Sequence, residues 1–181
     1  MHEALPMKRN WVERLGAVPA AGAALADFVL SFATLLGAWY FQFALGLAPC
    51  PLCLEQRVPY YVVIPLSLLL AIAAWARAPR PLVAVGFVAI LAAVLCGAAL
   101  GAYHAGVEWH FWPGPTDCTG PLADLNTGGS LLDQLNSVHV VRCDRAAWRF
   151  LGISLAGYNV LISLAMAAVA GYGLRACKHS A

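Results

Sequence analysis

Two pairs of cysteines are the residues of this sequence with the most obvious chemistry. Cys50 and Cys53 form a C-x-x-C motif, the spacing that dithiol oxidoreductases use. Cys118 and Cys143 follow as two well-separated single cysteines. A pair of thiols can form and exchange a disulfide, or it can contribute ligands to a zinc ion. The compartment that each thiol faces decides between these chemistries, so the elements that position the cysteines come next.

The composition predicts an all-α membrane protein. Hydrophobic residues make up 61% of the 181 residues and charged residues only 11%, whereas soluble domains carry about 25% charged residues. Apolar runs of roughly 18 residues or more indicate helices that span a bilayer. A very apolar soluble bundle is the less favoured alternative. We expect one integral membrane domain over residues 1–181, a bundle of four transmembrane helices at about 20–47, 58–75, 81–103 and 150–174.

The positive charges predict how the four spans are oriented. Short loops rich in lysine and arginine stay in the cytoplasm, and with four spans these seven residues fall on one side: Lys8, Arg9, Arg14, Arg77, Arg80, Arg175 and Lys178. Both termini should therefore be cytoplasmic, with a short loop at 48–57 and a long loop at 104–149 on the periplasmic side. The first apolar run is too long for a cleaved signal peptide. A net charge of +2, without a basic stripe, argues against a nucleic-acid partner.

This topology sorts the six cysteines. Cys50, Cys53, Cys118 and Cys143 fall on the external side, where disulfides persist. We expect Cys96, inside the third span, to be a small buried apolar residue, and Cys177 to be a reduced thiol without a role.

The surroundings of the C-x-x-C motif favour redox chemistry. We expect the motif to open the second transmembrane helix, where free amide groups and the positive end of the helix dipole stabilise a thiolate. Arg57 follows Cys53 by one helical turn. Its guanidinium could stabilise that thiolate or donate a hydrogen bond to a carbonyl oxygen. The alternative is an arginine that extends to the membrane surface without a specific role.

The second cysteine pair has two interpretations. A disulfide between Cys118 and Cys143 could be a structural cross-link, since closing such a loop stabilises a domain by roughly 3 kcal/mol. It could also be presented to a soluble partner. Between the two cysteines, Ser130 and Asp133 form a capping box that predicts a short helix with an apolar face. That helix would lie on the membrane surface or form a small lid on the protein itself.

Histidines near the cysteines raise the question of zinc. His104, His110 and His139 could complete a ligand set with the external thiols, but structural zinc sites usually combine two closely spaced ligand pairs. We therefore expect no metal. His104 lies at the end of the third span, at the depth of a quinone head group, where it could bind or protonate a quinone. A histidine at the interface without a role is the alternative.

Several motifs together resemble the DsbB family of disulfide bond formation proteins. The resemblance covers about residues 20–174, with four spans and a paired-cysteine loop. Its motifs are Tyr40-Phe41-Gln42, Pro49-Cys50-Pro51-Leu52-Cys53 with Arg57, Tyr103-His104-Ala105-Gly106-Val107-Glu108-Trp109, and Trp112-Pro113-Gly114-Pro115 ahead of Cys118. Cys96 and Cys177 are not part of the family pattern.

The resemblance implies a mechanism in the bacterial inner membrane. Reduced DsbA, a thioredoxin-like periplasmic oxidase, would attack a Cys118–Cys143 disulfide at Cys118. Cys143 would then attack Cys50 in a Cys50–Cys53 disulfide and release Cys53 as a thiolate. Cys53 would donate electrons to a quinone, ubiquinone or menaquinone, that Arg57 orients. His104 would assist.

Two other readings compete with this one. Vitamin K epoxide reductases also couple thiols to quinones in a helical bundle, but their C-x-x-C opens a late helix, whereas here it opens the second. A non-catalytic membrane protein with two structural disulfides is the other. The type of quinone, the particular DsbA partner and the oligomeric state stay open.

Overall fold

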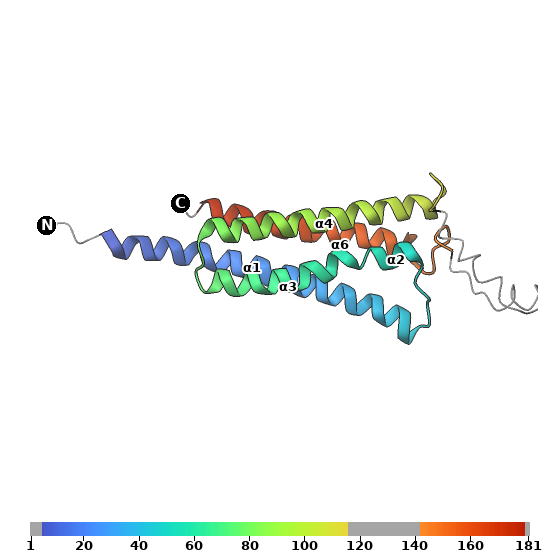
Figure 1. The fold of residues 1–181 in the computed structure, drawn as a ribbon, viewed down its shortest axis with the longest axis horizontal. Helices are drawn as coiled ribbons and strands as arrows, with labels where there is room; N and C mark the ends of the chain where they lie inside the picture. The colour runs from blue at the N-terminus through green and yellow to red at the C-terminus, as the bar shows by residue number, and fades with distance from the viewer. Residues whose placement is uncertain (1–4, 116–141, 180–181) are drawn as a thin grey trace, which may run out of the picture.

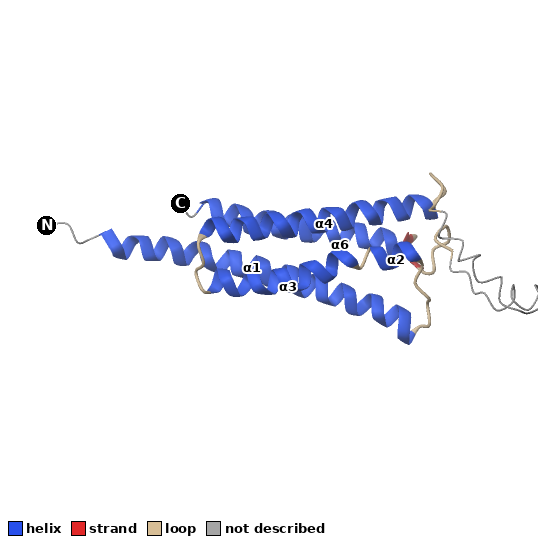
Figure 2. Cartoon of the chain, in the orientation of Figure 1, coloured by secondary structure: helices blue, strands red, loops and turns tan. Residues whose placement is uncertain are grey.

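The computed structural model describes residues 5–115 and 142–179. Cys118, His139 and the helix predicted from Ser130 lie outside these ranges, and so do the pairing and the positions predicted for them. The described residues form a long helical bundle with a minor two-stranded hairpin (Figures 1 and 2).

Four long helices make up the bundle. Helix α1 (Leu5–Trp39) continues into a π-helical turn, η1 (Tyr40–Ala44), and α3 (Val58–Trp75) follows the short α2 (Pro51–Glu55). Helices α4 (Arg80–Glu108) and α6 (Leu155–His179) complete it. Four segments are long and apolar enough to cross a membrane: Pro19–Ala44, Pro51–Trp75, Arg80–Glu108 and Leu155–Cys177. The predicted fold class, a four-helix membrane bundle, is confirmed.

The ends of the bundle are arranged as the predicted topology requires. Helix α1 begins and α6 ends at one end, while α2 and the chain leading into α6 lie at the other (Figure 1). The sequence order of the helices therefore brings the cysteine-bearing loops together, far from the termini.

Small residues let the helices approach closely. A Cβ atom added to Gly101 in α4 would lie 3.2 Å from the backbone oxygen of Ala156 in α6 and 3.0 Å from Val160. Close backbone approach of this kind is how helices associate where lipid removes the hydrophobic driving force. The centre of the bundle is filled by large buried side chains such as Phe87, Ile90 and Met166, and many of the outward-facing side chains are large and apolar.

Two helix boundaries differ from those predicted. Helix α4 continues to Glu108, beyond the predicted end at 103. The face that carries Val107 and Glu108 is buried inside the protein, where Val107 packs against Cys50 and Cys143. Helix α6 begins at Leu155 instead of 150. The intervening residues form a hairpin in which β1 (Arg149–Phe150) pairs antiparallel with β2 (Ile153–Ser154). Leu151 and Gly152 turn the chain with φ of 50° and 81°, the left-handed conformations of a tight hairpin turn.

The prediction for Cys96 was wrong. Its side chain is exposed on the outside of α4 instead of buried in the bundle. A helix that is apolar on all sides carries no sequence signal for which face meets lipid, so the cysteine was assigned to the wrong face. Cys177, in contrast, is partly buried and packs against the core.

Candidate redox site

Cys50 caps the short helix α2. Its extended backbone precedes Pro51 at the first helical position, and its sulfur accepts a hydrogen bond from the Cys53 amide at 3.3 Å. The Cys50 thiol donates to the Cys53 sulfur at 2.7 Å. A residue at this cap satisfies an amide that the helix leaves free, and the same geometry holds the two sulfurs close enough to form a disulfide after a small movement.

The C-x-x-C motif has its own helix. We expected it to open the second transmembrane helix directly, but a turn at Gln56 and Arg57 separates α2 from α3. Pro59 fits the start of α3, where its missing amide hydrogen costs no hydrogen bond. The turn directs the Gln56 side chain into the bundle, where it is buried.

Burial and hydrogen bonding raise the pKa of the Cys50 thiol. The largest cause is its hydrogen bond to Cys53, followed by removal from water. Cys50 is almost fully buried, while Cys53 is partly exposed to the adjoining pocket. The two thiols of the motif are therefore not equivalent: Cys50 is buried and keeps its proton, and Cys53 is the more exposed sulfur.

His104 lies in α4 directly beside Cys50. Its Nε2 atom is 3.7 Å from the Cys50 sulfur and 3.8 Å from Glu108 Oε1. The ring also makes a hydrogen bond to the backbone of Cys143. We predicted His104 at the end of the third span, but it is 3% exposed and lies one turn inside the helix. The ring is therefore enclosed by the protein instead of lying at the membrane surface, and its role in binding or protonating a quinone stays a prediction.

Cys143, in the segment that precedes β1 and α6, also lies beside Cys50. It is 1% exposed, takes part in a disulfide and packs in a small cluster with Cys50, Leu52 and Val107. The described member of the second cysteine pair therefore lies against the first pair. Its predicted partner, Cys118, lies outside the described residues.

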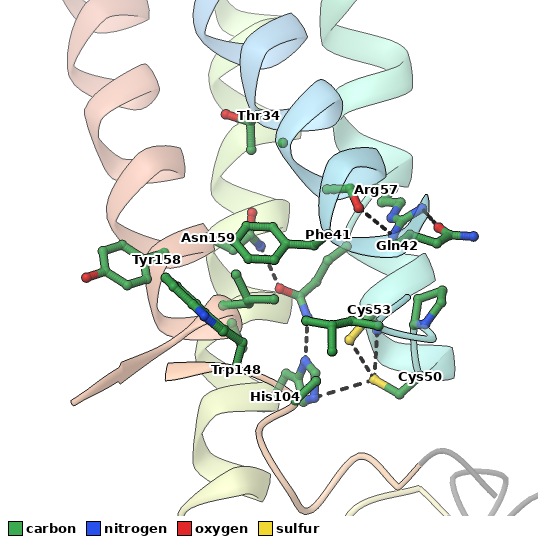
Figure 3. Close-up of a pocket in the computed structure, with 18 of the residues that line it drawn as sticks. Thr34, Phe41, Gln42, Cys50, Cys53, Arg57, His104, Trp148, Tyr158 and Asn159 are labelled. Atoms are coloured by element: carbon green, nitrogen blue, oxygen red, sulfur yellow. Dashed lines mark hydrogen bonds between the residues drawn. The ribbon is translucent and has the colours of Figure 1, made fainter. Parts of the chain in front are cut away.

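A buried chain of polar side chains extends from His104 into the bundle (Figure 3). Gln56 Nε2 is 2.7 Å from His104 Nδ1, Asn159 Nδ2 donates to Gln56 Oε1 at 2.7 Å, and Tyr60 donates to Asn159 Oδ1 at 2.5 Å. None of these three partners of His104 was predicted from the sequence. A lone asparagine inside an apolar span was the available signal, because such a residue is expensive in a membrane unless it is paired.

Arg57 is held by α1 and η1. Its Nη1 donates to Gln42 Oε1 at 2.6 Å and its Nη2 to the Ala38 carbonyl at 3.5 Å. These contacts are with the protein's own oxygens, and both roles predicted for this arginine stay predictions. The π-helical turn η1 accommodates an extra residue just where Gln42 faces Arg57 (Figure 3), and such turns are often found at functional sites.

These residues surround a deep pocket of about 610 Å³. Its wall is largely apolar and comes from several helices, and Phe41 and Trp148 add a pair of aromatic rings with centroids 5.0 Å apart. Its polar lining includes both motif cysteines, Arg57, His104 and Glu108. Glu108 Oε2 is buried with no hydrogen-bond partner among the described residues. A flat apolar ring with polar oxygen atoms, such as a quinone, fits this lining.

The site also brings potential metal ligands together. Ligand atoms of Cys50, Cys53 and His104 all lie within 4.8 Å of one another. A metal would need a free electron pair on His104 Nε2, the nitrogen that faces the sulfurs. The amide of Gln56 donates a hydrogen bond to the other nitrogen, Nδ1. The proton of the neutral ring is then on Nε2, which has no free electron pair for a metal. The arrangement therefore suits a dithiol beside a hydrogen-bond donor better than a metal centre.

Comparison with known proteins identifies the family. The family model "Disulfide bond formation protein DsbB" matches residues 20–173. The chain belongs to the DsbB family. The predicted resemblance is therefore confirmed, and with it a multi-pass membrane protein of disulfide bond formation.

Individual DsbB relatives cover most of the chain. Disulfide bond formation protein B of Xanthomonas campestris (strain 8004) is 31% identical over 81% of this chain and 88% of its own length. The protein of the same name from Methylococcus capsulatus is 30% identical over 80% and 87%. An uncharacterised protein of Rickettsia prowazekii is 27% identical over 78% and 80%. No solved structure gives a significant match.

Proposed function

We propose that this chain reoxidises a periplasmic DsbA-type thiol oxidase and passes the electrons to a membrane quinone, ubiquinone or menaquinone. The observation that carries the proposal is the position of Cys53. Both motif cysteines line the 610 Å³ apolar pocket, but Cys50 is buried in a cluster with Cys143, whereas Cys53 at the edge of that cluster is partly exposed. One cysteine thus faces the second redox pair, and the other faces a space suited to a lipid-soluble acceptor.

The proposed orientation follows from the same arrangement. The cysteine end of the bundle would face the periplasm, where a soluble partner can reach the long loop, and both termini would be cytoplasmic. This placement agrees with the distribution of lysine and arginine. It also supports a location in the bacterial inner membrane.

The thiol chemistry proceeds by exchange between the two cysteine pairs. The partner's thiolate attacks Cys118 in a Cys118–Cys143 disulfide, which frees Cys143 as a thiolate. Cys143 then attacks Cys50, the Cys50–Cys53 bond breaks, and Cys53 leaves with the electron pair. The contact between Cys143 and Cys50 within one buried cluster supports this step. The partner's second thiol then attacks the partner sulfur bound to Cys118, so that the partner leaves as a disulfide and Cys118 is freed as a thiolate. Cys118 attacks Cys143 in the Cys143–Cys50 disulfide and releases Cys50, which pairs with Cys53 again once the electron pair has left. Overall, the partner's dithiol gives up two electrons and two protons.

A quinone supplies the oxidising capacity by accepting those two electrons and two protons. The residues of the pocket would hold its ring between apolar side chains and present donors to its oxygens. Arg57 is fixed by Gln42, so its guanidinium does not have to be ordered when the ring binds. The disulfide pool then stays oxidised as long as respiration drains the quinol.

The test is quinone reduction by the purified protein with reduced DsbA, followed by the loss of quinone absorbance. The wild type should turn over, and Cys118→Ala should not reduce quinone with DsbA as the donor. If Cys118→Ala turned over at the wild-type rate, electrons would enter by another route. If the wild type reduced no quinone while its external cysteines stayed oxidised, the cysteine pairs would be structural cross-links.

A further inference from the structure

The buried chain Tyr60–Asn159–Gln56–His104 has a defined direction. Each member belongs to a different part of the bundle: α3, α6, the turn after α2, and α4. All four side chains are buried, with between 3% and 9% of their surface exposed. Because water does not compete here, the hydrogen-bond orientation of one member constrains the next.

Backbone carbonyls fix the orientation of the two amides. Gln56 Nε2 also donates to the Leu52 carbonyl at 3.3 Å, and Asn159 Nδ2 also donates to the Gly97 carbonyl at 3.4 Å. Rotating either amide by 180° would place its oxygen against a carbonyl oxygen in a buried site, where unsatisfied acceptors are costly. The NH₂ group of Gln56 therefore faces His104.

This orientation decides which ring nitrogen of His104 carries the proton. Nδ1 must accept the hydrogen bond from Gln56, so the proton of the neutral ring is on Nε2. The surroundings of Nε2 agree, because its two side-chain neighbours are acceptors: the Cys50 sulfur at 3.7 Å and Glu108 Oε1 at 3.8 Å. With Nδ1 occupied by Gln56, the hydrogen bond between the ring and the Cys143 backbone also belongs to Nε2, beside Cys50. An imidazolium would set a second ring N–H against the Gln56 NH₂.

We propose that Tyr60, Asn159 and Gln56 are positioning residues that hold His104 as a neutral Nε2–H donor directed at Cys50, so that His104 donates a hydrogen bond and does not act as a base. The proposal deepens the proposed function, on which its activity test rests. It assigns to His104 the stabilisation of negative charge that develops on Cys50 when Cys118 attacks Cys143 in the Cys143–Cys50 disulfide and Cys50 leaves as a thiolate. It also revises the expectation that His104 protonates a quinone.

Several other charged and titratable groups lie near His104. Cys50 and Cys53 come from α2 and its cap, Glu108 lies one turn along α4, and Cys143 approaches with its backbone. Arg149, from β1, is the cation whose charge acts on Glu108. With His104 held neutral, Glu108 is the carboxylate of the pocket that can exchange protons.

The first test reads the tautomer directly by ¹⁵N NMR of the full-length protein with labelled histidine, in the reduced state and without quinone. The His104 signals, assigned from their loss in His104→Gln, should show a protonated Nε2 and an unprotonated Nδ1 near neutral pH. A protonated Nδ1 would overturn the proposal. This measurement does not depend on turnover, so its result is separate from the outcome of the quinone assay.

The second test separates a donor from a base. The His104→Gln side chain offers an amide N–H but has no basic nitrogen, whereas His104→Ala offers neither. We expect His104→Gln to reduce quinone at least roughly tenfold faster than His104→Ala, since a hydrogen bond to a charged group contributes about 1.5–3 kcal/mol. Equal loss in both variants would show that a basic nitrogen is needed.

A third variant changes the hydrogen-bonded chain of polar side chains and leaves the His104 side chain itself unaltered. Gln56→Glu replaces the NH₂ donor by a carboxylate oxygen of nearly the same shape, which can accept from Nδ1. The NMR signal of His104 should then shift to a form with a protonated Nδ1, and the pH profile of quinone reduction should change with it. Glu55→Gln, at the exposed end of α2 next to Gln56, is the matched control and should leave the tautomer unchanged. If Gln56→Glu left the tautomer unchanged as well, the chain would not control His104.

Discussion

The two ends of the bundle bury polar residues in different ways. At the cysteine end, Gln56, His104 and Asn159 are each joined to a neighbour by a hydrogen bond. Toward the other end, Asp27 lies in α1 with 0% of its surface exposed, and neither carboxylate oxygen has a hydrogen-bond partner among the described residues. Small alanines and large apolar side chains fill the surroundings of that half.

This contrast indicates which half is built for packing and which for chemistry. A polar group in a membrane is tolerated when it is paired, and an unpaired one costs free energy. The cysteine end stabilises its polar groups collectively and therefore fixes their positions. Within the described part of the protein Asp27 has no such partners, so we expect its removal to cost no stability, whereas removal of one member of the Tyr60–Asn159–Gln56–His104 chain leaves the others unpaired.

The largest effect should come from Cys53, the sulfur that faces the pocket. Cys53→Ser cannot form the Cys50–Cys53 disulfide, so we expect quinone reduction to fall by at least roughly 100-fold, since the nucleophile itself is lost. The measurement is quinone absorbance with reduced DsbA, and Cys96→Ser serves as the matched control. If Cys53→Ser turned over at a rate close to wild type, a residue other than Cys53 would donate the electrons to the quinone.

Arg57 should affect quinone use more than thiol exchange. Arg57→Ala removes a guanidinium that Gln42 holds at the pocket wall, and a charge-assisted hydrogen bond contributes about 1.5–3 kcal/mol, or roughly 10–100-fold. We expect KM for quinone to rise by that factor, while exchange between the cysteine pairs, followed by trapping the thiols, stays unchanged. A variant with normal quinone affinity would make Arg57 a surface arginine that merely reaches toward water.

The raised pKa of Cys50 predicts how the reduced site responds to pH. A thiol with a raised pKa keeps its proton at pH values where an ordinary thiol, with a pKa of about 8.5, ionises. Alkylation of Cys50 in the dithiol state should therefore be slow near neutral pH and still increase above pH 9. Because the hydrogen bond to Cys53 is the largest cause, Cys53→Ala should make Cys50 react faster at neutral pH. Peptide mapping by mass spectrometry measures the rate, and a plateau near pH 8.5 in the unmodified site would contradict the prediction.

Much of this fold was predictable from the sequence because its main signals are one-dimensional. Apolar runs and the positions of arginine and lysine predict four spans, and the spacing of Cys50 and Cys53 predicts a redox pair. Partners across the bundle were not predictable in the same way. Gln56 and Asn159 meet only after α2, α4 and α6 have packed, and a single amide in an apolar stretch does not reveal its partner.

A pair of substitutions tests the comparison between the two ends through stability. Asn159→Leu leaves Gln56 and Tyr60 without their partner and should lower the free energy of unfolding by about 1–3 kcal/mol, the cost of an unsatisfied buried polar group. Asp27→Asn replaces a buried carboxyl group that has no hydrogen-bond partner among the described residues, and should leave stability equal or higher. Thermal unfolding in the same detergent measures both. Destabilisation by Asp27→Asn as large as that by Asn159→Leu would show that the acid is held by interactions as extensive as those of the cysteine end.

The smallest effect should come from Cys96, which the structure places on the outer face of α4. Its thiol lies on the bundle surface, so Cys96→Ala removes little packing and no redox partner. We expect quinone reduction within about twofold of wild type and an unchanged melting temperature, as is usual for surface substitutions. A thiol-reactive, lipid-soluble probe should label Cys96 in the wild type and leave activity intact. If labelling at Cys96 stopped turnover, the outer face of α4 would belong to the route by which the acceptor enters the pocket, and the redox site could not be assigned to the cysteine end alone.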